Sequence, residues 1–364
     1  MINLRYLLAA SNTLLVRGPA SIRLLDGEAS ILASPIQPNQ RIAVPNQKQL
    51  PVEAKSDTVL DAVFKKTGGL LEIEGSTIPS SWNEATEALL DMKEGRVMVI
   101  GDTDVGKSTM CVYLVNSLIE RGVNVRVVDA DIGQSDLGPP TTIGSATPSM
   151  FITSLSDLTL ASLLFIGHTS PNQVESKLIN GIQRLSTNSE NALTIVNTDG
   201  WVLEPEAIFY KTGLIASLKP DLVLGLERGN ELHPILSSSR ANSMRISTAK
   251  QVLARSRSNR RDIRAAGFLR FLGGGRVRSI SLEDMSLSIP NGFPTPLGPR
   301  ARELRDLIVG FLGQNGYLIQ IGIFQGIEDA AVRVYCKEFS DARAMEFGYV
   351  RLSISGREIG YFDA

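Results

Sequence analysis

The amino-acid sequence predicts an α/β protein. Its central parallel sheet, covered by helices on both faces, is flanked by an N-terminal β-sandwich and by a smaller C-terminal domain of mixed or β-rich structure. Three observations lead to this prediction. The 364 residues exceed one ordinary domain. Strand-length and helix-length apolar segments alternate through the middle of the chain, as in a parallel sheet. Short segments broken by Gly and Pro precede them, and candidate strands follow.

The N-terminal domain is predicted to span residues 1–86. Its segments 20–27 and 28–33 have the length and alternation of strands joined by turns. The chain begins with a short apolar run, as a signal peptide would, but Asn12 and Thr13 interrupt that run and alternation continues beyond them. We therefore expect strands there rather than a leader peptide.

The central domain is predicted to span residues 87–278 and the C-terminal domain residues 279–364. A helix is expected from Lys107 to Arg121, because a helical pattern there stops at Gly122. Strands of the central sheet are expected at 96–100, 125–129, 163–166, 193–196 and 222–224. Strands of the last domain are expected at 318–324, 331–335 and 349–353.

Composition favours a globular protein of a reducing compartment. Hydrophobic residues make up 43% of the chain and charged residues 21%. No stretch approaches the roughly 20 apolar residues that cross a bilayer. The two cysteines, Cys111 and Cys336, are far apart and lack the spacing of metal ligands. We therefore predict a cytoplasmic protein with no membrane partner.

Positive charge is concentrated in one segment, although the whole chain has a net charge of −1. Between Arg240 and Arg278 ten Arg and one Lys stand against one acid, Asp262, so this segment carries +10 and the remainder −11. Such an island indicates a surface for a polyanion. A solvated basic helix is the alternative interpretation.

The strongest functional motif lies between the expected strand at 96–100 and the following helix. It satisfies G-x-x-x-x-G-K-[ST] with Gly101, Asp102, Thr103, Asp104, Val105, Gly106, Lys107, Ser108 and Thr109. Backbone N–H groups of such a loop bind phosphate oxygens at a helix N-terminus. Lys107 is expected to bridge the β- and γ-phosphates, and Ser108 to bind Mg²⁺ or another divalent metal. The sequence therefore predicts a P-loop domain that binds ATP.

Two carboxylates follow the next expected strand, in the segment Asp129-Ala-Asp131-Ile-Gly133-Gln134. Transfer of a phosphoryl group to a hydroxyl needs a carboxylate to hold hydrated Mg²⁺ and a group to accept the proton of the acceptor. Asp129 and Asp131 are suited to divide these tasks. A strand-end cap is the alternative for Asp129.

Three other classes of P-loop protein are disfavoured by residues that the sequence lacks. A GTPase would carry Asn-Lys-x-Asp, whereas Asn197 is followed by Thr-Asp-Gly. A partitioning-type ATPase would carry a Lys where this chain has Asp102. A motor ATPase usually pairs its strand-end Asp with a Glu, and here the segment is Asp-Ala-Asp. These differences favour transfer to a bound acceptor over hydrolysis.

Taken together, the motifs resemble those of the P-loop polynucleotide 5′-hydroxyl kinases. That family includes subunits of eukaryotic pre-mRNA cleavage and rRNA-processing complexes, as well as archaeal single-chain relatives. The resemblance covers nearly the whole chain, including segments 321–324 and 347–352. It rests on the P-loop, on Asp129-x-Asp131-x-Gly133-Gln134, on Thr198-Asp-Gly200-Trp201 and on the arginines from 255 to 264.

The resemblance implies roles for the matching residues. Lys107, Ser108 and Thr109 correspond to phosphate and Mg²⁺ ligands, and Asp131 to the carboxylate that acts on the 5′-hydroxyl. The implied acceptor contacts are Gln134, Thr198, Gly200 and Trp201, and the implied lid arginines over the triphosphate are Arg255, Arg260 and Arg264. The family also holds the nucleotide base with its N-terminal domain.

Physical arguments from the residues themselves bear on some of these roles. Arg257, Arg260, Arg261 and Arg264 lie at i, i+3, i+4 and i+7, so a helix would place them on one face that can neutralise a triphosphate. Attraction of RNA alone is the alternative. Trp201 follows a predicted strand end, where its ring could stack on an unpaired base, and core packing is the alternative interpretation. His168 follows another strand end at this sheet edge and is a further candidate contact to the acceptor, although a structural or solvent-exposed histidine is the favoured interpretation.

We therefore predict an ATP-dependent, metal-requiring kinase that phosphorylates the 5′-hydroxyl end of single-stranded RNA, with DNA as a further acceptor, by in-line γ-phosphoryl transfer. Catalysis is assigned to Lys107, Asp131, Arg260 and Arg264. The metal is assigned to Ser108, Asp129 and Asp131. An ATP-bound scaffold subunit of an RNA-processing complex is the alternative, and an ATPase switch is a third interpretation. RNA-processing proteins are the expected partners.

Overall fold

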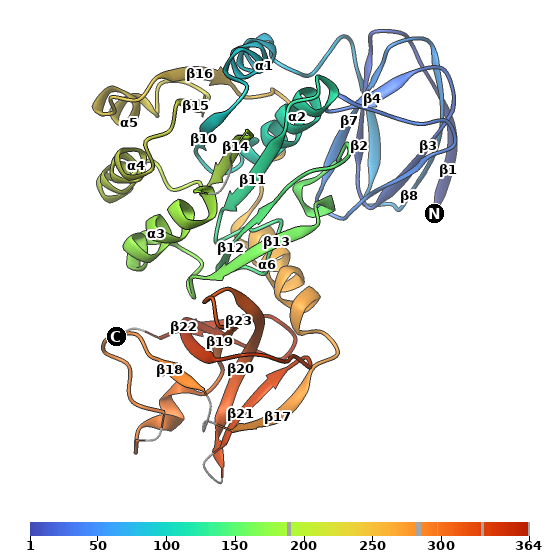
Figure 1. Ribbon diagram of the computed structural model, residues 1–364. Helices are drawn as coiled ribbons and strands as arrows, with labels where there is room; N and C mark the ends of the chain where they lie inside the picture. The colour runs from blue at the N-terminus through green and yellow to red at the C-terminus, as the bar shows by residue number, and fades with distance from the viewer. Residues whose placement is uncertain (188–190, 282–284, 297, 329–330, 363–364) are drawn as a thin grey trace.

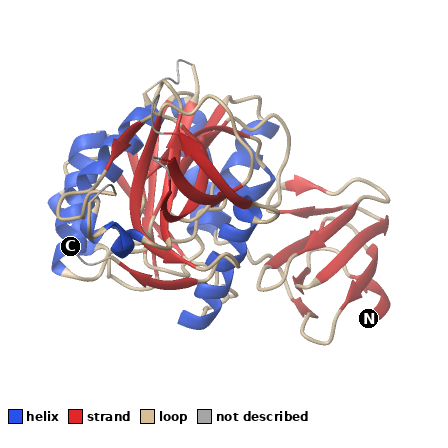
Figure 2. Ribbon diagram, turned by 90° about the horizontal axis from the view of Figure 1, so that it is seen from below, coloured by secondary structure: helices blue, strands red, loops and turns tan. Residues whose placement is uncertain are grey.

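The computed structural model describes residues 1–187, 191–281, 285–296, 298–328 and 331–362. The central domain lies between an N-terminal and a C-terminal domain (Figure 1), and Figure 2 shows that the N-terminal domain is built from strands without helices. The predicted fold class is confirmed, because a largely parallel sheet at the centre is flanked by antiparallel sheets in the N-terminal domain and by a mostly antiparallel, mixed sheet in the C-terminal domain. Among the described residues, no helix has the length and apolar character that a membrane span requires.

The N-terminal domain is a sandwich of two antiparallel sheets. Apolar side chains such as Leu14, Ile22, Val52 and Leu60 are buried in its core, which follows from the alternation of the strands. One sheet contains β1 (Ile2–Leu8), β8 (Thr58–Phe64), β3 (Ala20–Asp26) and β6 (Arg41–Val44). The other contains β5 (Ser34–Pro35), β4 (Ala29–Ile31), β7 (Gln49–Ala54), β2 (Thr13–Arg17) and β9 (Gly69–Ile73). The first residues are thus strands, as expected.

The central sheet has seven strands, and six of them run in the same direction. Only β12 is antiparallel to its neighbours β11 and β13, because neither connection contains an α-helix that would cross over the sheet. In spatial order the strands are β13 (Leu160–Phe165), β12 (Thr142–Ala146), β11 (Val125–Ala130), β14 (Leu193–Thr198), β10 (Gly95–Gly101), β15 (Leu222–Glu227) and β16 (Ser243–Ser247).

Helices cover both faces of this sheet (Figure 1). Val97 and Val99 of β10 pack in the core with α1 (Ser80–Met92) and α2 (Lys107–Glu120). Met98 and Ile100 alternate with them and pack with α3 (Glu175–Ser186), α4 (Pro205–Leu218) and α5 (His233–Ser238). The predicted domain boundary at residue 86 falls inside α1, which packs on α2 and β16.

The C-terminal domain is built on a third sheet, and α6 (Arg257–Leu272) leads into it from the central domain (Figure 1). The predicted boundary at residue 278 falls inside β17. Short 3₁₀ helices lie at Leu155–Asp157, Pro171–Gln173 and Ala301–Leu304. The sheet contains β17 (Arg276–Ser281), β21 (Ala331–Cys336), β20 (Leu318–Glu328), β19 (Leu307–Leu312), β22 (Ala344–Leu352) and β18 (Ser286–Ser288), with β23 (Glu358–Tyr361) paired to β22.

A buried amide ties α2 to the N-terminal domain. Asn116 has no exposed surface, and its Nδ2 donates to the carbonyl oxygens of Leu32 at 2.7 Å and Ile152 at 2.8 Å. Its Oδ1 accepts from the backbone N–H of Ile152 at 2.9 Å. One side chain thus satisfies three backbone groups that have little access to water, one in the N-terminal domain and two in the loop after β12.

We expect Asn116→Ala to lower the free energy of unfolding by roughly 2–3 kcal/mol, because buried backbone groups lose their partners. Chemical denaturation measures this loss. Asn124→Ala is the matched control, since its amide is exposed and makes a 3.4 Å hydrogen bond to Asn191. Equal stability of the two variants would show that this buried amide does not stabilise the fold.

Candidate active site

Loops that follow four strands meet at one edge of the central sheet. The P-loop follows β10, residues 131–134 follow β11, residues 167–170 follow β13 and residues 199–201 follow β14. A Cβ on Gly200 would lie 2.6–2.8 Å from atoms of Thr103, and a Cβ on Gly133 would lie 2.9 Å from the carbonyl oxygen of Thr169. Glycine at these two positions therefore lets the loops touch. The structure brings the predicted motifs together.

The P-loop leads into α2 as the sequence predicted. Gly106 has a φ of 97°, a conformation that favours glycine, and it caps α2. The Lys107 ammonium group donates to the carbonyl oxygens of Gly101 at 2.9 Å and Asp102 at 2.8 Å. Burial lowers the pKa of Lys107, and the charge of Asp131 opposes this shift. A phosphate would supply the counter-charge that this buried cation lacks in its own loop.

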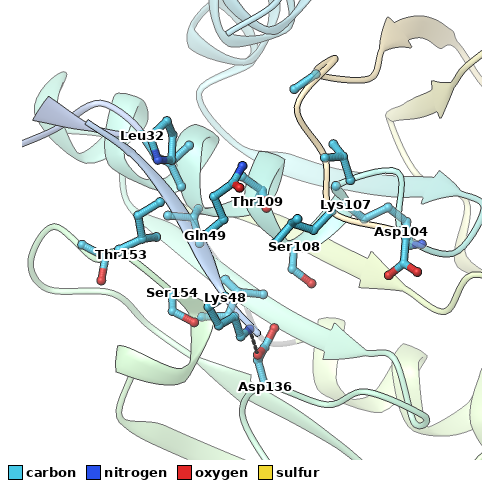
Figure 3. Close-up of a pocket in the computed structure, with 18 of the residues that line it drawn as sticks. Leu32, Lys48, Gln49, Asp104, Lys107, Ser108, Thr109, Asp136, Thr153 and Ser154 are labelled. Carbon is cyan, nitrogen blue, oxygen red and sulfur yellow. Dashed lines mark hydrogen bonds and ion pairs between the residues drawn. The ribbon is translucent and has the colours of Figure 1, made fainter. Parts of the chain in front are cut away.

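A cavity of about 300 Å³ opens beside Lys107 and Ser108 (Figure 3). Its walls come from the N-terminal domain, the P-loop, residues 134–136 and residues 153–157. Lys48 of the N-terminal domain pairs with Asp136 at 3.1 Å, and Gln49 Nε2 donates to the carbonyl of Gln251 at 3.0 Å. The first domain therefore closes one side of the cavity, where the implied contacts to the nucleotide base would lie.

The candidate metal ligands Ser108 and Asp129 are joined by Asn197. Its Nδ2 donates to Ser108 Oγ at 3.2 Å and to Asp129 Oδ1 at 3.0 Å. Asp129 has no exposed surface, and its Oδ2 accepts from Ser135 Oγ and from backbone N–H groups of the 136–137 loop. Asp129 thus caps this loop, which was the alternative interpretation, and it remains next to the P-loop serine.

The residues present fit Mg²⁺. Burial, with the charges of Asp136 and Asp131, raises the pKa of Asp129 to about 7, so a cation beside it would offset an unfavourable charge. Asn197 Oδ1 is buried and has no hydrogen-bond partner among the described residues. Within the same residues no group of three His, Cys, Asp or Glu side chains could hold a metal. An ion bound to Ser108 and Asp129 would therefore complete its shell with water and phosphate oxygens, as Mg²⁺ does.

Asp131 lies at the start of the loop after β11. Its Oδ1 accepts from the backbone N–H groups of Gly133 at 3.1 Å and Gln134 at 2.9 Å, whereas its Oδ2 makes no hydrogen bond with the described residues. Burial raises the pKa of Asp131, while Lys107 lowers it and Asp199 raises it. One oxygen is thus fixed and the other is available, in a carboxylate that binds protons more readily than usual. Gln134 lines the cavity.

Thr198 does not reach the acceptor side. It has no exposed surface, and its hydroxyl donates to the carbonyl of Val99 at 2.8 Å. The contact to the acceptor expected of this side chain is corrected to a structural bond between β14 and β10. Trp201 is partly exposed and stacks on Tyr210, with ring centroids 5.9 Å apart and planes at 27°.

A buried ion pair supports the Trp201 turn. Lys211, with no exposed surface, donates from Nζ to Asp199 Oδ2 at 2.8 Å. Asp199 also accepts from the Trp201 backbone N–H at 3.0 Å and from the Tyr210 hydroxyl at 3.1 Å. Burial lowers the pKa of Lys211, and Asp199 opposes the shift. One carboxylate therefore fixes the turn that presents the tryptophan.

His168 lies where the central and C-terminal domains meet. It is 7% exposed, and its ring packs against Tyr349 and Tyr361 with centroids 5.6 and 5.3 Å away. Its Nδ1 lies 2.9 Å from the backbone nitrogen of Ser170. This position differs from an open contact to an acceptor, because two aromatic rings cover the imidazole.

The predicted lid arginines are held by carboxylates. Arg260 Nη1 lies 2.9 Å from Asp104 Oδ2, and the Arg255 backbone N–H donates to the same oxygen at 3.0 Å. Arg255 precedes α6, which begins at Arg257, so its place outside the helical stripe is explained. Arg264 pairs instead with Glu358 of the C-terminal domain. Asp104, a P-loop residue with a φ of 54°, thus fixes the start of α6 beside the loop.

The arginine stripe of α6 does not act as one face. Arg260 and Arg264 are partly buried and bind carboxylates, whereas Arg257 and Arg261 are exposed and form no ion pair within the described part of the chain. The i, i+3, i+4, i+7 spacing spreads residues across a broad stripe. The P-loop covers the stripe at Arg260 and the C-terminal domain covers it at Arg264. The exposed pair remains available to a polyanion.

Several residues of the site were not found from the sequence. Asn197 is separated from Ser108 by 89 residues, and Glu358 from Arg264 by 94. The motif Thr198-Asp-Gly200-Trp201 contains Asp199, but nothing in it identifies Lys211 as the partner. Nothing in the sequence around Lys48 predicted that it would pair with Asp136.

Comparison with known proteins identifies the central domain. A family model described as the mRNA cleavage and polyadenylation factor CLP1 P-loop matches residues 101–274. The central domain is therefore similar to this Clp1 family. The polyribonucleotide 5′-hydroxyl-kinases of Pyrococcus furiosus and Pyrococcus horikoshii are 29% and 27% identical to this chain over 79% of it, and over 96% and 94% of their own lengths. The polyribonucleotide 5′-hydroxyl-kinase Clp1 of Gallus gallus is 28% identical over 55% of this chain and 50% of its own length. The resemblance drawn from the motifs is confirmed.

Solved Clp1 structures share the whole architecture. A Clp1p–Pcf11p complex matches with a TM-score of 0.72 at 12% identity, covering 96% of this chain and 98% of the other. A second Clp1p–Pcf11p structure gives a TM-score of 0.73 at 11% identity, with 96% and 99% covered. Identities this low show a common fold and nothing further. All three domains therefore belong to the Clp1 fold.

We expect Lys211→Met to lower the free energy of unfolding by about 3–5 kcal/mol, since it leaves the Asp199 carboxylate buried without its cation. Chemical denaturation measures the loss, and the fluorescence of Trp201 reports whether its turn has moved. Lys250→Met is the control, because Lys250 is exposed. A Lys211 variant as stable as this control would show that the ion pair does not support the turn.

Proposed function

We propose that this protein is an ATP-dependent kinase that phosphorylates the 5′-hydroxyl end of a polynucleotide, with single-stranded RNA as the preferred acceptor and DNA as a second one. The observation that carries the proposal is the position of Asp131. A carboxylate with one oxygen fixed and one available stands beside the buried P-loop lysine. This is where an acceptor hydroxyl must approach a γ-phosphate.

The relatives support the same activity. Full-length matches in two Pyrococcus species are named polyribonucleotide 5′-hydroxyl-kinases. An ATP-bound scaffold would tolerate loss of Asp131, which acts on the acceptor rather than on ATP, and Asp131 is retained here. An RNA-processing protein partner and a cytoplasmic location stay predictions for this chain.

The residues divide the chemistry among them. Lys107 turns from its own loop carbonyls to the β- and γ-phosphates, and the N–H groups of the P-loop hold the phosphate oxygens. Ser108 and Asp129 would hold Mg²⁺, which when bound neutralises phosphate charge. The 5′-hydroxyl oxygen of the acceptor attacks the γ-phosphorus and transfers its proton to Asp131. ADP leaves on the side opposite to the attacking oxygen. Arg260 and Arg264 stabilise the charge of the transferring group.

The direct test uses ATP labelled at the γ-phosphate, Mg²⁺ and matched 5′-hydroxyl RNA and DNA oligonucleotides. We expect label at the 5′ end of RNA, and less on DNA. Oligonucleotides that already carry a 5′-phosphate are the control. Hydrolysis of ATP without labelled product would favour the ATPase switch, and binding of ATP without either product would favour the scaffold.

We expect Asp131→Asn to lose phosphoryl transfer by roughly 10²–10⁴-fold while it still binds ATP, because an amide keeps the shape but cannot accept a proton. Single-turnover transfer measures the first effect, and titration with a fluorescent ATP analogue measures the second. Lys107→Ala is the comparison variant and should lose both. Equal loss of transfer and ATP binding in Asp131→Asn would make Asp131 a nucleotide ligand.

We expect Arg264→Ala to lower kcat by at least ~10² at saturating ATP and RNA, since an arginine that acts in the transition state contributes more than a phosphate contact. Lysine should restore little, because it lacks the planar fork of guanidinium. Arg257→Ala is the matched control on the exposed side of the same helix. A variant with normal kcat and weaker RNA binding would make α6 a docking surface only.

A further inference from the structure

The helix α6, which carries the predicted lid arginines Arg260 and Arg264, packs against the C-terminal domain. Phe268 and Leu272, near the end of α6, have no exposed surface and pack in one cluster with Ile308, Ile323 and Val350 of the third sheet. Gly356 precedes β23, and a Cβ there would lie 2.8 Å from the carbonyl oxygen of Ala265. The turn before β23 thus touches the backbone of α6. Movement of the C-terminal sheet would move the helix with it.

One carboxylate of the C-terminal domain, that of Glu358, binds the Arg264 guanidinium group through two hydrogen bonds. Glu358 Oε1 accepts from Arg264 Nε, and Glu358 Oε2 accepts from Nη2 at 2.9 Å. Both side chains are shielded, with 16% of the Arg264 side chain and 9% of the Glu358 side chain exposed. A two-point pair of this kind fixes the plane of the guanidinium group as well as its position. The Nη1 group makes no hydrogen bond with the described residues, so one edge of Arg264 stays available.

The strand that carries Glu358 is anchored to the acceptor side of the site. The Tyr361 hydroxyl lies 2.8 Å from Thr169 Oγ1 and 3.4 Å from Glu358 Oε2. Thr169 in turn contacts the loop of Asp131, because its carbonyl approaches Gly133. A continuous set of contacts therefore links the Asp131 loop through Thr169 and Tyr361 to the carboxylate that holds Arg264.

We propose that Glu358 is a positioning residue of the kinase reaction, which aligns the free edge of Arg264 with the transferring phosphoryl group. The C-terminal domain would thereby complete the active site rather than only support the fold. The inference rests on the proposed kinase function and on the assignment of Arg264 to the transition state. The negative charge of Glu358 partly cancels the positive charge of the guanidinium group. Glu358 therefore contributes to the rate by orienting Arg264 rather than by adding charge.

Glu358→Gln is the first test, in the full chain, because glutamine keeps the shape but cannot accept two hydrogen bonds from guanidinium. We expect kcat to fall by roughly 10- to 100-fold, with the KM values for ATP and RNA changed by less than about threefold. Glu358→Asp keeps the charge and shortens the arm, so it should also lower kcat. It provides a second variant if glutamine prevents folding. Glu338→Gln is the control, since Glu338 pairs with Arg278 in the same domain and its side chain is 81% exposed.

A double-mutant cycle separates positioning from a general structural role. In the Arg264→Ala background, Glu358→Gln should change kcat by less than about twofold, because its effect passes through Arg264. A normal or raised kcat in Glu358→Gln would overturn the inference, and so would an undiminished loss when Arg264 is absent. A wild-type chain that labels no 5′-hydroxyl oligonucleotide would instead refute the proposed function itself.

Discussion

A loop that binds phosphate must leave its backbone N–H groups free, and this requirement shapes the surroundings of the P-loop. The loop cannot stabilise itself with those donors, so neighbouring groups hold it from outside. Gly200 allows the turn after β14 to pack on Thr103. Lys107 binds two carbonyls of the loop, and Asp104 binds Arg255 and Arg260. Each support comes from a different strand end or helix, so the loop geometry depends on the complete sheet edge.

The second constraint is that buried charges need partners. Four buried charged groups lie at this sheet edge, namely Asp129, Asp199, Lys107 and Lys211, and the half-buried Asp131 lies beside them. Asp199 and Lys211 satisfy each other, so their charges support the Trp201 turn without entering the chemistry. Asp129 and Lys107 have no such fixed counter-ion, and burial shifts both pKa values toward the neutral forms. Binding of Mg²⁺ and of phosphate would supply the missing charges. The presence or absence of a fixed counter-ion thus distinguishes the structural pair Asp199–Lys211 from Asp129 and Lys107, which are suited to bind ligands.

Sequence motifs and hydrophobic periodicity predicted those parts of the structure that depend on neighbouring residues in the chain. The P-loop, the helix behind it and the strand that ends at Asp129 depend on residues close in sequence, and their predicted places agree with β10, α2 and β11. Thr198 was misjudged because a motif gives spacing but not the direction of a side chain. The reversed direction of β12 depends on the segments that connect it to β11 and β13, and no hydrophobic periodicity in those segments predicts their path. The pairs Asn197 with Ser108 and Glu358 with Arg264 join distant segments, so only the folded arrangement reveals them.

The three domains contribute unequal parts of one site, and this bears on how the protein can move. The N-terminal domain closes the cavity through Lys48 and Gln49, while the C-terminal domain holds α6 through an apolar cluster and one ion pair. An α6 fixed in this way cannot swing as a free lid, because its buried end would lose apolar contacts. Access for a nucleotide therefore requires side-chain exchange at Asp104 and Lys107, or a joint movement of α6 with the C-terminal sheet. Exchange of ion pairs disrupts less packing, so under the proposed function an incoming triphosphate would displace the Asp104 carboxylate from Arg255 and Arg260.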